Sequence, residues 1–281
     1  MAAFRRFGSG TLGDTLPSGF LPYRAIPAFI QRDFREMARV AVNGVTGTAW
    51  KHGPLNFEGY LGDVEPDVPR SGVRRLVLWQ PLTRSDRPKG WFRIPVQPNA
   101  TITGVAEIKQ PEAYWEHWSE HARRHRNKFL KDDRFEVIDL PYEQYEQIYT
   151  RLPRAMGITG LLTRITARKV ERHGTLVEFF GVREKETGTI AGGFATFDIP
   201  EAKISVHLAS FILPDYRQTS VGVGMVDAWF KRSIAKGIRF NDFDLFHAPG
   251  DPTSWHGFSQ FKSQFVTHFV KYPKPLARFG K

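Results

Sequence analysis

The sequence contains no cysteine, and this absence excludes several kinds of chemistry at once. Without thiols the chain has no disulfide, no thiolate nucleophile and no cysteine-ligated zinc, which fits a reducing compartment. Its nine histidines show no His-Glu-x-x-His motif and no other spacing typical of metal ligands. We therefore predict that the protein holds no metal.

Long apolar runs are also missing. The longest, such as residues 76–79 and 211–213, are far shorter than the ~20 residues that a membrane-spanning helix needs. The first ten residues carry charge, but no apolar stretch follows them, so no secretory signal is predicted. We expect a soluble, cytoplasmic protein without a transmembrane segment.

Positive charge, in contrast, is abundant. The chain has 40 Lys and Arg against 29 Asp and Glu, a formal net charge of +11. Such an excess attracts phosphate-rich partners, namely RNA, nucleotide-linked substrates or an anionic lipid surface. It also serves simply to keep a globular protein in solution. With 281 residues, 41% of them hydrophobic, the chain is long enough for one large domain or two fused subdomains.

The most informative segment is residues 204–246, which predicts a strand, a glycine-containing turn, a helix and a second strand. The helix follows from apolar residues at helical spacing and from Gly237 at its end. Gly222 and Gly224 at its start allow the backbone to approach an anion, and the first helical turn offers unpaired N–H groups to it. Ordinary helix starts and turns use paired glycines too, so the spacing alone leaves a phosphate site and a packing role open.

This order of elements resembles the GNAT acyltransferases, whose acyl-CoA site carries Gln/Arg-x-x-Gly-x-Gly/Ala at the start of a helix. Gly222 and Gly224 match the two small positions, and the leading Gln/Arg position falls on Thr219. A predicted hairpin, 176–182 and 189–197, and the strand 204–213 match the meander that precedes the turn in that fold. The resemblance implies that the donor is bound by Arg217, Gln218, Thr219, Val221, Gly222, Val223 and Gly224.

A second resemblance narrows the class. Residues 255–265, WHGFSQFKSQF, are similar to the Gly…Phe-Lys…Phe ending of the FemABX-like transferases. Those enzymes are built from GNAT-type units and move an aminoacyl group from aminoacyl-tRNA to a cell-wall precursor. The basic helix predicted at 112–131 resembles theirs, so the likeness covers roughly 111–265. It implies that Lys262 contacts the charged donor or the developing oxyanion. This chain has Val266 where the family usually has glycine after the last Phe.

The resemblance implies an α/β (α+β) fold, a GNAT-like mixed sheet with flanking helices, in one unit or in two fused GNAT-like units. We expect a flexible arm at 1–24, an eroded first unit with the basic helix at 25–150, and a second unit with the glycine turn at 151–281. Within the first unit the pattern predicts a helix over 27–42 and strands over 74–79 and 91–94, with a loop between the strands.

The basic helix has two interpretations. Its aromatic residues, including Trp115 and Trp118, form an apolar stripe, while Arg124 and Lys128 lie on another face together with Lys131. Acids come first and bases last, as the helix dipole favours, which explains much of the pattern as a solvated face. Alternatively, Arg124 and Lys128 contact the phosphates of a substrate or of RNA, and a second basic segment at 164–172 extends that surface.

Transfer of an acyl group to an amine needs a proton acceptor and a group that stabilises the tetrahedral oxyanion. Lys262 suits the second task. His207 on the strand before the glycine turn, and Asp242 or Asp244 on the strand after it, suit the first. A strand histidine is also often a packing residue, and an aspartate at a strand end is often a cap.

Residues near the FemABX-like motif are candidates for an acceptor pocket: His247, His256, Trp255 and Phe261. The same side chains also serve to cover a core.

We therefore predict a transferase that moves an acyl or aminoacyl group onto an amine. Its donor is acyl-CoA or aminoacyl-tRNA, with tRNA and an anionic cell-wall precursor as possible partners. One alternative is a non-catalytic RNA-binding module that uses the basic surface together with Trp115 and Trp118. Another is a GNAT-like fold whose site has decayed, since fold does not determine function.

Overall fold

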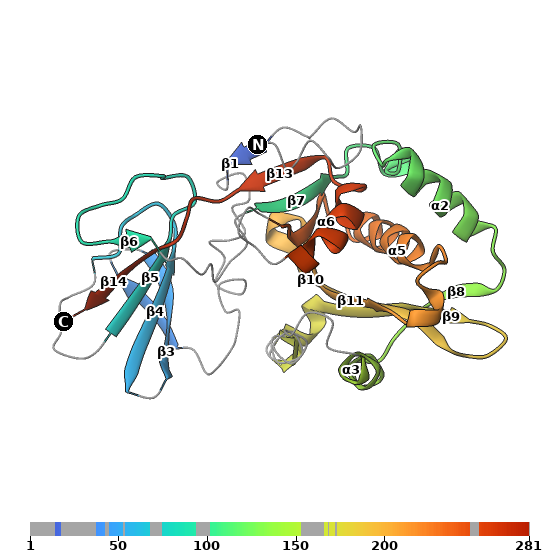
Figure 1. The fold of residues 1–281 in the computed structure, drawn as a ribbon, viewed down its shortest axis with the longest axis horizontal. Helices are drawn as coiled ribbons and strands as arrows, with labels where there is room; N and C mark the ends of the chain where they lie inside the picture. The colour runs from blue at the N-terminus through green and yellow to red at the C-terminus, as the bar shows by residue number, and fades with distance from the viewer. Residues whose placement is uncertain are drawn as a thin grey trace. The chain divides into compact units, whose positions relative to one another are not determined.

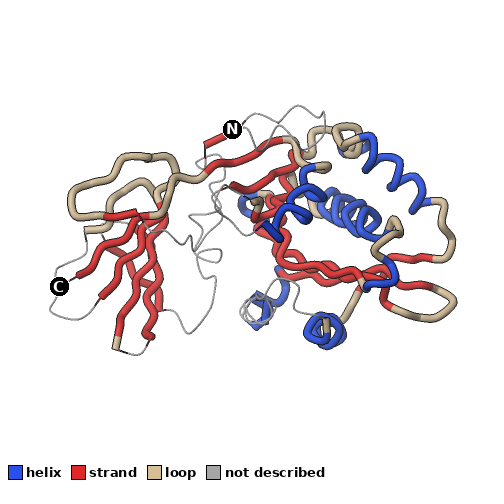
Figure 2. The backbone as a smooth tube through the Cα atoms, in the orientation of Figure 1, coloured by secondary structure: helices blue, strands red, loops and turns tan. Residues whose placement is uncertain are grey.

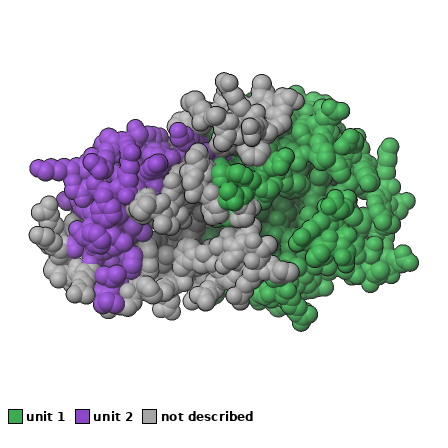
Figure 3. All heavy atoms as spheres, viewed as in Figure 1, with its two compact units in different colours: residues 1–14, 104–269 green, residues 15–103, 270–281 purple. Residues whose placement is uncertain are grey.

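The computed structural model describes residues 15–17, 38–42, 45–52, 54–67, 75–93, 102–152, 166–167, 169–171, 173–247 and 253–280. The chain forms two compact units, which are coloured separately in Figure 3. Unit 1 comprises 1–14 and 104–269, and unit 2 comprises 15–103 and 270–281. The described strands form two sheets, one built mainly from unit 1 and one within unit 2.

An eight-stranded mixed sheet carries the candidate site, with strand order β1-β13-β7-β12-β11-β10-β9-β8. Its strands are β1 (Thr15–Pro17), β7 (Ile102–Glu107), β8 (Phe135–Asp139), β9 (Val177–Glu184), β10 (Ile190–Ile199), β11 (Ile204–Ile212), β12 (Phe240–Leu245) and β13 (His268–Lys271). Short 3-10 turns punctuate it: η4 (Pro111–Ala113), η5 (Gly174–Leu176), η6 (Pro200–Ala202), η7 (Pro214–Tyr216) and η8 (Thr253–Trp255). The predicted hairpin is confirmed as β9 and β10, an antiparallel pair whose connecting turn contains Gly188 at φ 70°.

Helices cover both faces of this sheet, as Figures 1 and 2 show. Helix α3 (Tyr142–Arg151) lies on one face, where Tyr145 packs against Phe179 and Phe211. Helix α5 (Val221–Ala235) lies on the other, with its Trp229 ring 5.3 Å from that of Phe194. The predicted helix is thus confirmed, and Gly237 follows it at φ 69°, a conformation that glycine adopts without steric cost.

Helix α5 is enclosed on its outer side by helix α2 (Glu120–Leu130). All residues from Val221 to Phe230 are therefore buried. Between the helices Arg126 forms a buried ion pair with Asp227, which also accepts a hydrogen bond of 2.6 Å from the Tyr114 hydroxyl. The Trp118 ring packs edge-on against Phe230, with 5.2 Å between the ring centres.

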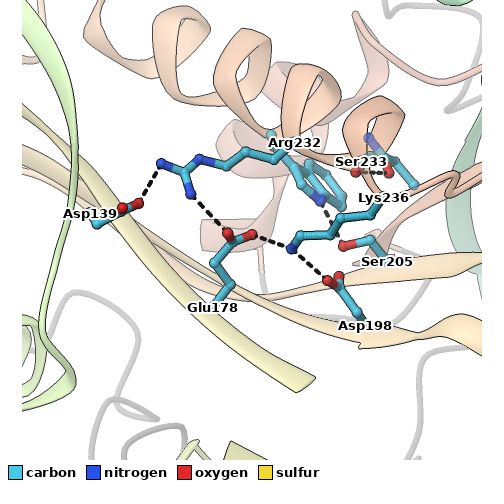
Figure 4. Close-up of polar contacts among 9 residues, drawn as sticks. Asp139, Glu178, Asp198, Ser205, Arg232, Ser233 and Lys236 are labelled. Atoms are coloured by element: carbon cyan, nitrogen blue, oxygen red, sulfur yellow. Dashed lines mark hydrogen bonds and ion pairs between the residues drawn. The ribbon is translucent and has the colours of Figure 1, made fainter. Parts of the chain in front are cut away.

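The last turns of α5 are held to the sheet by ion pairs, which Figure 4 shows. Arg232 donates to Glu178 at 2.8 Å and to Asp139 at 2.6 Å. Lys236 donates to the same Glu178 at 2.6 Å and to Asp198 at 2.7 Å. Two cations on one helix thus share one carboxylate on β9. We call these five side chains the α5 ion network.

Unit 2 contains a six-stranded sheet of order β2-β3-β4-β5-β14-β6. The strands are β2 (Ala38–Val42), β3 (Val45–His52), β4 (Leu55–Leu61), β5 (Arg75–Gln80), β14 (Leu276–Gly280) and β6 (Phe92–Arg93). Its core is a cluster of Tyr60, Val77, Trp79, Trp91 and Leu276. The predicted strands at 74–79 and 91–94 correspond to β5 and to the shorter β6, with the predicted loop between them, while residues 74 and 94 lie outside the described residues.

Several predicted elements differ from the observed ones. Ala38–Val42 is strand β2 and not part of a helix, because it pairs with β3 throughout; residues 27–37 lie outside the described residues. The basic helix begins at Glu120 rather than 112, because the Ser119 hydroxyl accepts the N–H of Ala122 and so caps α2 there. In the expected arm, Thr15–Pro17 is a strand, and the rest of 1–24 lies outside the described residues.

The compact units divide at 103/104 and 269/270, because α2 packs along α5 within unit 1 and β14 completes the sheet of unit 2 between β5 and β6. The division into an arm and two GNAT-like units, with boundaries at 24/25 and 150/151, stays a prediction. In the part of the chain that the structure describes, no helix is both long enough and apolar enough to cross a bilayer.

Candidate functional site

The candidate site begins where the parallel strands β11 and β12 part. They pair at Ile204 with Phe240, at Ser205 with Asn241 and at Val206 with Asp242. Within the described residues no pairing between them follows, although both strands continue. The backbone groups beyond this point need other partners, because a buried carbonyl without a hydrogen bond is costly.

Lys262 supplies two of those hydrogen bonds. It lies on helix α6 (His256–Ser263), and its ammonium donates to the carbonyl oxygens of Phe243 at 2.6 Å and Leu245 at 3.3 Å. Burial lowers its pKa to about 8, although the charges of Asp244 and Asp242 act in the opposite direction. Lys262 is thus a partly buried lysine whose ammonium form is less favoured than that of an exposed lysine.

Asp242 lies fully buried beside this lysine. Burial raises its pKa well above the usual range, and the charge of Asp244 adds to the effect. The N–H of Asp244 donates to the Asp242 carboxylate at 2.8 Å and partly offsets it, as does Lys262. Asp244 itself has φ 56°, a left-handed conformation that is uncommon for residues other than glycine.

His207 completes the cluster from β11. Its Nε2 lies 3.1 Å from the Ser210 hydroxyl, and its ring packs 4.7 Å from that of Phe194. Burial lowers its pKa well below the usual value, the charge of Lys262 lowers it further, and Asp244 raises it. Lys262 thus acts on both His207 and Asp242, so the structure brings the three predicted catalytic residues within electrostatic reach of one another. Their roles in catalysis remain predictions.

A β-bulge in β11 explains why His207 and Ser210 face the same way. Thr196 of β10 pairs with His207 and Ala195 pairs with Ala209, which leaves Leu208 as an extra residue. The alternation of faces is therefore reset at Leu208. Ser205 and His207 contact Trp229 of α5 before the bulge. After it, Ala209 packs in the core on the α3 side, and Ser210 lies on the same face as His207.

The two glycines of the turn have a packing explanation. A Cβ on Gly224 would lie 2.6 Å from ring carbons of Phe129 on α2, closer than real Cβ atoms come to other atoms. A Cβ on Gly222 would lie 2.9 Å from the Ile212 side chain and 3.4 Å from Phe261. Both glycines therefore let neighbouring side chains approach the start of α5. Their part in donor binding remains a prediction.

The other predicted donor contacts lie around this turn in different environments. Arg217 and Gln218 are exposed, whereas Val221 and Val223 are buried. The Thr219 hydroxyl donates to the Tyr216 carbonyl at 2.6 Å and accepts the N–H of Val221 at 3.3 Å. Thr219 thus holds the start of α5 through its own hydrogen bonds.

A histidine pair on α2, which the sequence argument missed, lies beside the same turn. His125 Nδ1 lies 3.0 Å from the hydroxyl of Ser220, the residue before α5, and the His121 ring is 4.4 Å away from its ring. Burial lowers the pKa of His125, and the nearby charges of His121, Arg124 and Lys128 lower it further. The i, i+4 spacing of the histidines was the available signal.

Arg124 and Lys128 are exposed on α2, as predicted for a face that meets solvent or phosphate. Arg126, in contrast, turns inward to Asp227, and its guanidinium lies 4.0 Å from the Trp115 ring centre. Trp118 is buried in the core. Of the second basic segment, Lys169 is buried, while Arg164, Arg168 and Arg172 lie outside the described residues.

The residues predicted for an acceptor pocket lie at or next to α6. The rings of His247 and His256 are 3.9 Å apart, and the N–H of His247 donates to Ser259 at 2.8 Å. Trp255 packs 6.0 Å from Phe258. Phe261 borders Gly222 at the start of α5. Among the described residues, no group of three or more His, Asp or Glu side chains is placed to hold a metal ion.

Comparisons with known proteins identify the fold. No family model matches the sequence, and no curated protein matches it. Among solved structures, FemX aligns with a TM-score of 0.66 and 11% identity over 96% of this chain and 93% of its own. A conserved protein of unknown function from Bacteroides thetaiotaomicron VPI-5482 aligns with a TM-score of 0.57 and 9% identity over 100% and 97%.

The chain therefore has the FemX fold, which confirms the FemABX-like fold predicted from its sequence. At this level of identity the likeness concerns the fold. What the chain does must be argued from its own residues.

Proposed function

We propose that the protein is a transferase that moves an acyl or aminoacyl group onto an amine. The observation that carries the proposal is the cluster at the parting of β11 and β12, where the partly buried Lys262 lies with the buried side chains of Asp242 and His207. Each has its pKa shifted toward the neutral form, as is typical of groups that exchange protons or stabilise transient charge. This cluster lies on the FemX fold.

In the proposed reaction the acceptor amine attacks the carbonyl carbon of the donor ester or thioester. The carbonyl oxygen becomes an oxyanion, which the ammonium of Lys262 stabilises by a hydrogen bond. His207, whose depressed pKa keeps it neutral, or Asp242 accepts the proton that the amine loses. The intermediate then expels the alcohol or thiol of the donor, which takes up a proton.

We propose that the donor binds beside the start of α5. Exposed Arg124 and Lys128 and the partly buried His125 surround this point, which favours a donor rich in phosphate. The first-turn glycines are enclosed by Phe129, Ile212 and Phe261. Because the exposed cations extend along α2 rather than over the glycines, we favour aminoacyl-tRNA as the donor over acyl-CoA. An anionic cell-wall precursor is the corresponding acceptor.

The experiment is a transfer assay guided by ligand stabilisation. Thermal shifts with CoA, acetyl-CoA, aminoacyl-tRNA and nucleotide-linked sugar peptides first select the substrate pair, since a tight ligand raises stability by mass action. Lys262→Ala is then expected to reduce turnover about a hundredfold to a thousandfold with little change in donor binding. Lys185→Ala, an exposed lysine in the β9–β10 turn, is the matched control. Full activity in Lys262→Ala would contradict the proposal.

A second candidate, a non-catalytic RNA-binding module, is favoured by the exposed cations of α2 alone. It predicts binding of uncharged tRNA that falls steeply with salt, because each neutralised phosphate releases counterions. Arg124→Glu with Lys128→Glu would weaken that binding, while Lys109→Glu with Lys185→Glu makes the same charge change elsewhere. RNA binding without any transfer, and without an effect of Lys262→Ala, would select this candidate.

A further inference from the structure

The edge of the unit 2 sheet exposes two aromatic side chains together. Phe279 on β14 is 71% exposed and Phe92 on β6 is 37% exposed. Their rings stack with centres 5.5 Å apart and planes at 27°. Large apolar side chains exposed as a pair are an unusual feature of a protein surface, where single ones are common. We call Phe92 and Phe279 the aromatic edge.

Strand register explains why both rings point the same way. Ala277 of β14 pairs with Phe92, and Phe279 lies two residues further along the same face. Side chains on the opposite face of these strands pack in or against the core of unit 2. There the Arg278 guanidinium lies 4.8 Å from the Trp91 ring centre and donates to the Pro66 carbonyl at 3.0 Å. The aromatic edge is therefore left over after the unit has packed its own core.

The chain around the aromatic edge is rich in cations without ion pairs. Arg87, Lys89 and Arg93 flank Phe92 in sequence, Lys274 precedes β14, and all four are exposed. None of them forms a salt bridge within the described residues. They are thus available to an external anion.

Three of the nearby acids, in contrast, are engaged within the unit, while a fourth, Asp67, is exposed. Asp63 accepts the N–H groups of Leu82, Thr83 and Arg84, and so anchors the loop that leads to β6. Asp86 pairs with Arg84. Glu65 accepts the Trp91 indole N–H at 2.7 Å. The exposed cations in this part of the chain therefore outnumber its one remaining exposed acid, Asp67, and the loop that carries Arg87 and Lys89 is fixed at both ends.

We propose that the aromatic edge docks unit 2 onto an anionic phospholipid surface. Aromatic rings favour the boundary between headgroups and acyl chains, and Lys and Arg beside them attract anionic lipid headgroups. Phe92 and Phe279 enter the interface while Arg87, Lys89 and Lys274 contact headgroup phosphates. Arg93, which pairs with Leu276, lies on the opposite face of the sheet. The proposal does not depend on the proposed transfer activity.

The test is sedimentation of the full chain with vesicles of phosphatidylcholine alone, or of phosphatidylcholine with 30% phosphatidylglycerol. Binding is expected only to the anionic vesicles, and we expect it to weaken as salt rises. Phe92→Ser with Phe279→Ser should reduce partitioning at least about tenfold, because it removes the apolar contribution. Arg87→Ser with Lys89→Ser should reduce it about tenfold at low salt. Leu130→Ser, which removes an exposed apolar side chain of unit 1, is the control and should change nothing.

A second measurement guards against loss of folding. The tryptophan fluorescence of Phe279→Trp should be quenched more strongly than that of the wild type by brominated lipid in anionic vesicles. Equal binding by the wild type and the double phenylalanine variant would overturn the proposal, as would binding to neither kind of vesicle. Light scattering that shows a dimer, dissociated by the phenylalanine substitutions, would instead assign the aromatic edge to contact between two copies and overturn the lipid assignment.

Discussion

Two groups of charged side chains in unit 1 use burial in opposite ways. In the α5 ion network, burial lowers the pKa of Arg232 and Lys236, but hydrogen bonds to Asp139, Glu178 and Asp198 outweigh it, so both pKa values are raised. The buried Arg126 behaves in the same manner beside Tyr114 and Asp227. These cations are held in their charged form.

At the parting of β11 and β12 the balance is reversed. Burial prevails over the neighbouring charges, so the pKa of Lys262 falls to about 8, that of His207 falls well below its usual value, and that of Asp242 rises. The comparison teaches that the ion pairs of the α5 network favour the charged forms of their side chains, whereas the environment of this cluster favours the neutral forms. A group held near its neutral form is suited to proton transfer.

The largest expected effect concerns the pH dependence of turnover. If the ammonium of Lys262 stabilises the oxyanion, the rate should fall as pH rises above about 8, by about tenfold for each further pH unit, because the charged form is lost. Lys262→Arg keeps its charge and should show no such fall. Rates measured from pH 6 to 10 check this, with Lys236→Ala expected to retain the wild-type profile. A rate that rises through pH 8 would instead make Lys262 the proton acceptor.

Among the substitutions that affect stability, the loss of the buried cation Arg126 should lower the free energy of unfolding the most. Arg126→Met leaves Asp227 buried with only Lys231 and Tyr114 as partners, and should lower the free energy of unfolding by about 3 kcal/mol. Urea denaturation measures it. Arg123→Met, an exposed neighbour on α2, should stay within about 0.5 kcal/mol of the wild type. Equal effects of the two substitutions would break the comparison.

For Asp242→Asn we expect a pH-dependent gain in stability relative to the wild type, in contrast to the loss expected for Arg126→Met. Because the pKa of Asp242 is raised in the folded protein, its contribution to stability is present below the pKa of the unfolded chain and is lost as pH rises through the folded value. The stability of the variant relative to the wild type should therefore increase from pH 4 to pH 8. We expect this change to be smaller than that of Arg126→Met, since Lys262 and the Asp244 N–H offset part of the burial. Thermal denaturation across that range checks it, and a decrease would contradict the assignment.

The smallest effect is expected in the α5 ion network. Glu178→Gln removes the carboxylate that Arg232 and Lys236 share, and should cost about 1 kcal/mol, because these side chains are partly exposed and solvent screens them. Glu136→Gln removes the carboxylate of a more exposed ion pair, that with Arg183, and should cost less than about 0.5 kcal/mol. Denaturation at low and high salt measures both. A loss in Glu178→Gln that salt does not reduce would speak against a screened ion network.

Much of unit 1 could be predicted because local signals and tertiary packing agree there. The apolar spacing of Val223, Val226 and Phe230 and the terminal Gly237 predicted α5, and alternation around Gly188 predicted the hairpin. The start of α2 was placed too early because Trp115 and Trp118 have helical spacing with the residues that follow. In the structure Ser119 is the N-cap, so α2 begins after it. Ala38–Val42 forms a strand because pairing with β3 outweighs a weak helical pattern.

Only part of the candidate site could be predicted, because some of its residues lie in local motifs and others come together only through tertiary packing. Lys262, His207 and Asp242 were found because they lie next to recognisable motifs, and the structure places them together. The proximity of His125 to Ser220 was not found, because it depends on how α2 lies along α5. Likewise the glycines of the turn indicated an anion, while their contacts with Phe129 and Ile212 arise only once distant elements have packed.

The extra residue Leu208 has a consequence for tracing the ancestry of this chain. It inverts which face of the sheet each later residue of β11 occupies, so Phe211 reaches the α3 core and Ile212 reaches the start of α5. A relative that lacked only this residue would keep the same pairing with β10 and the same two environments, because regular alternation would be restored. An alignment that places no gap at Leu208 would therefore equate later residues of β11 with residues from the opposite side of the sheet. Conservation measured across that part of β11 would then compare core positions with positions facing α5.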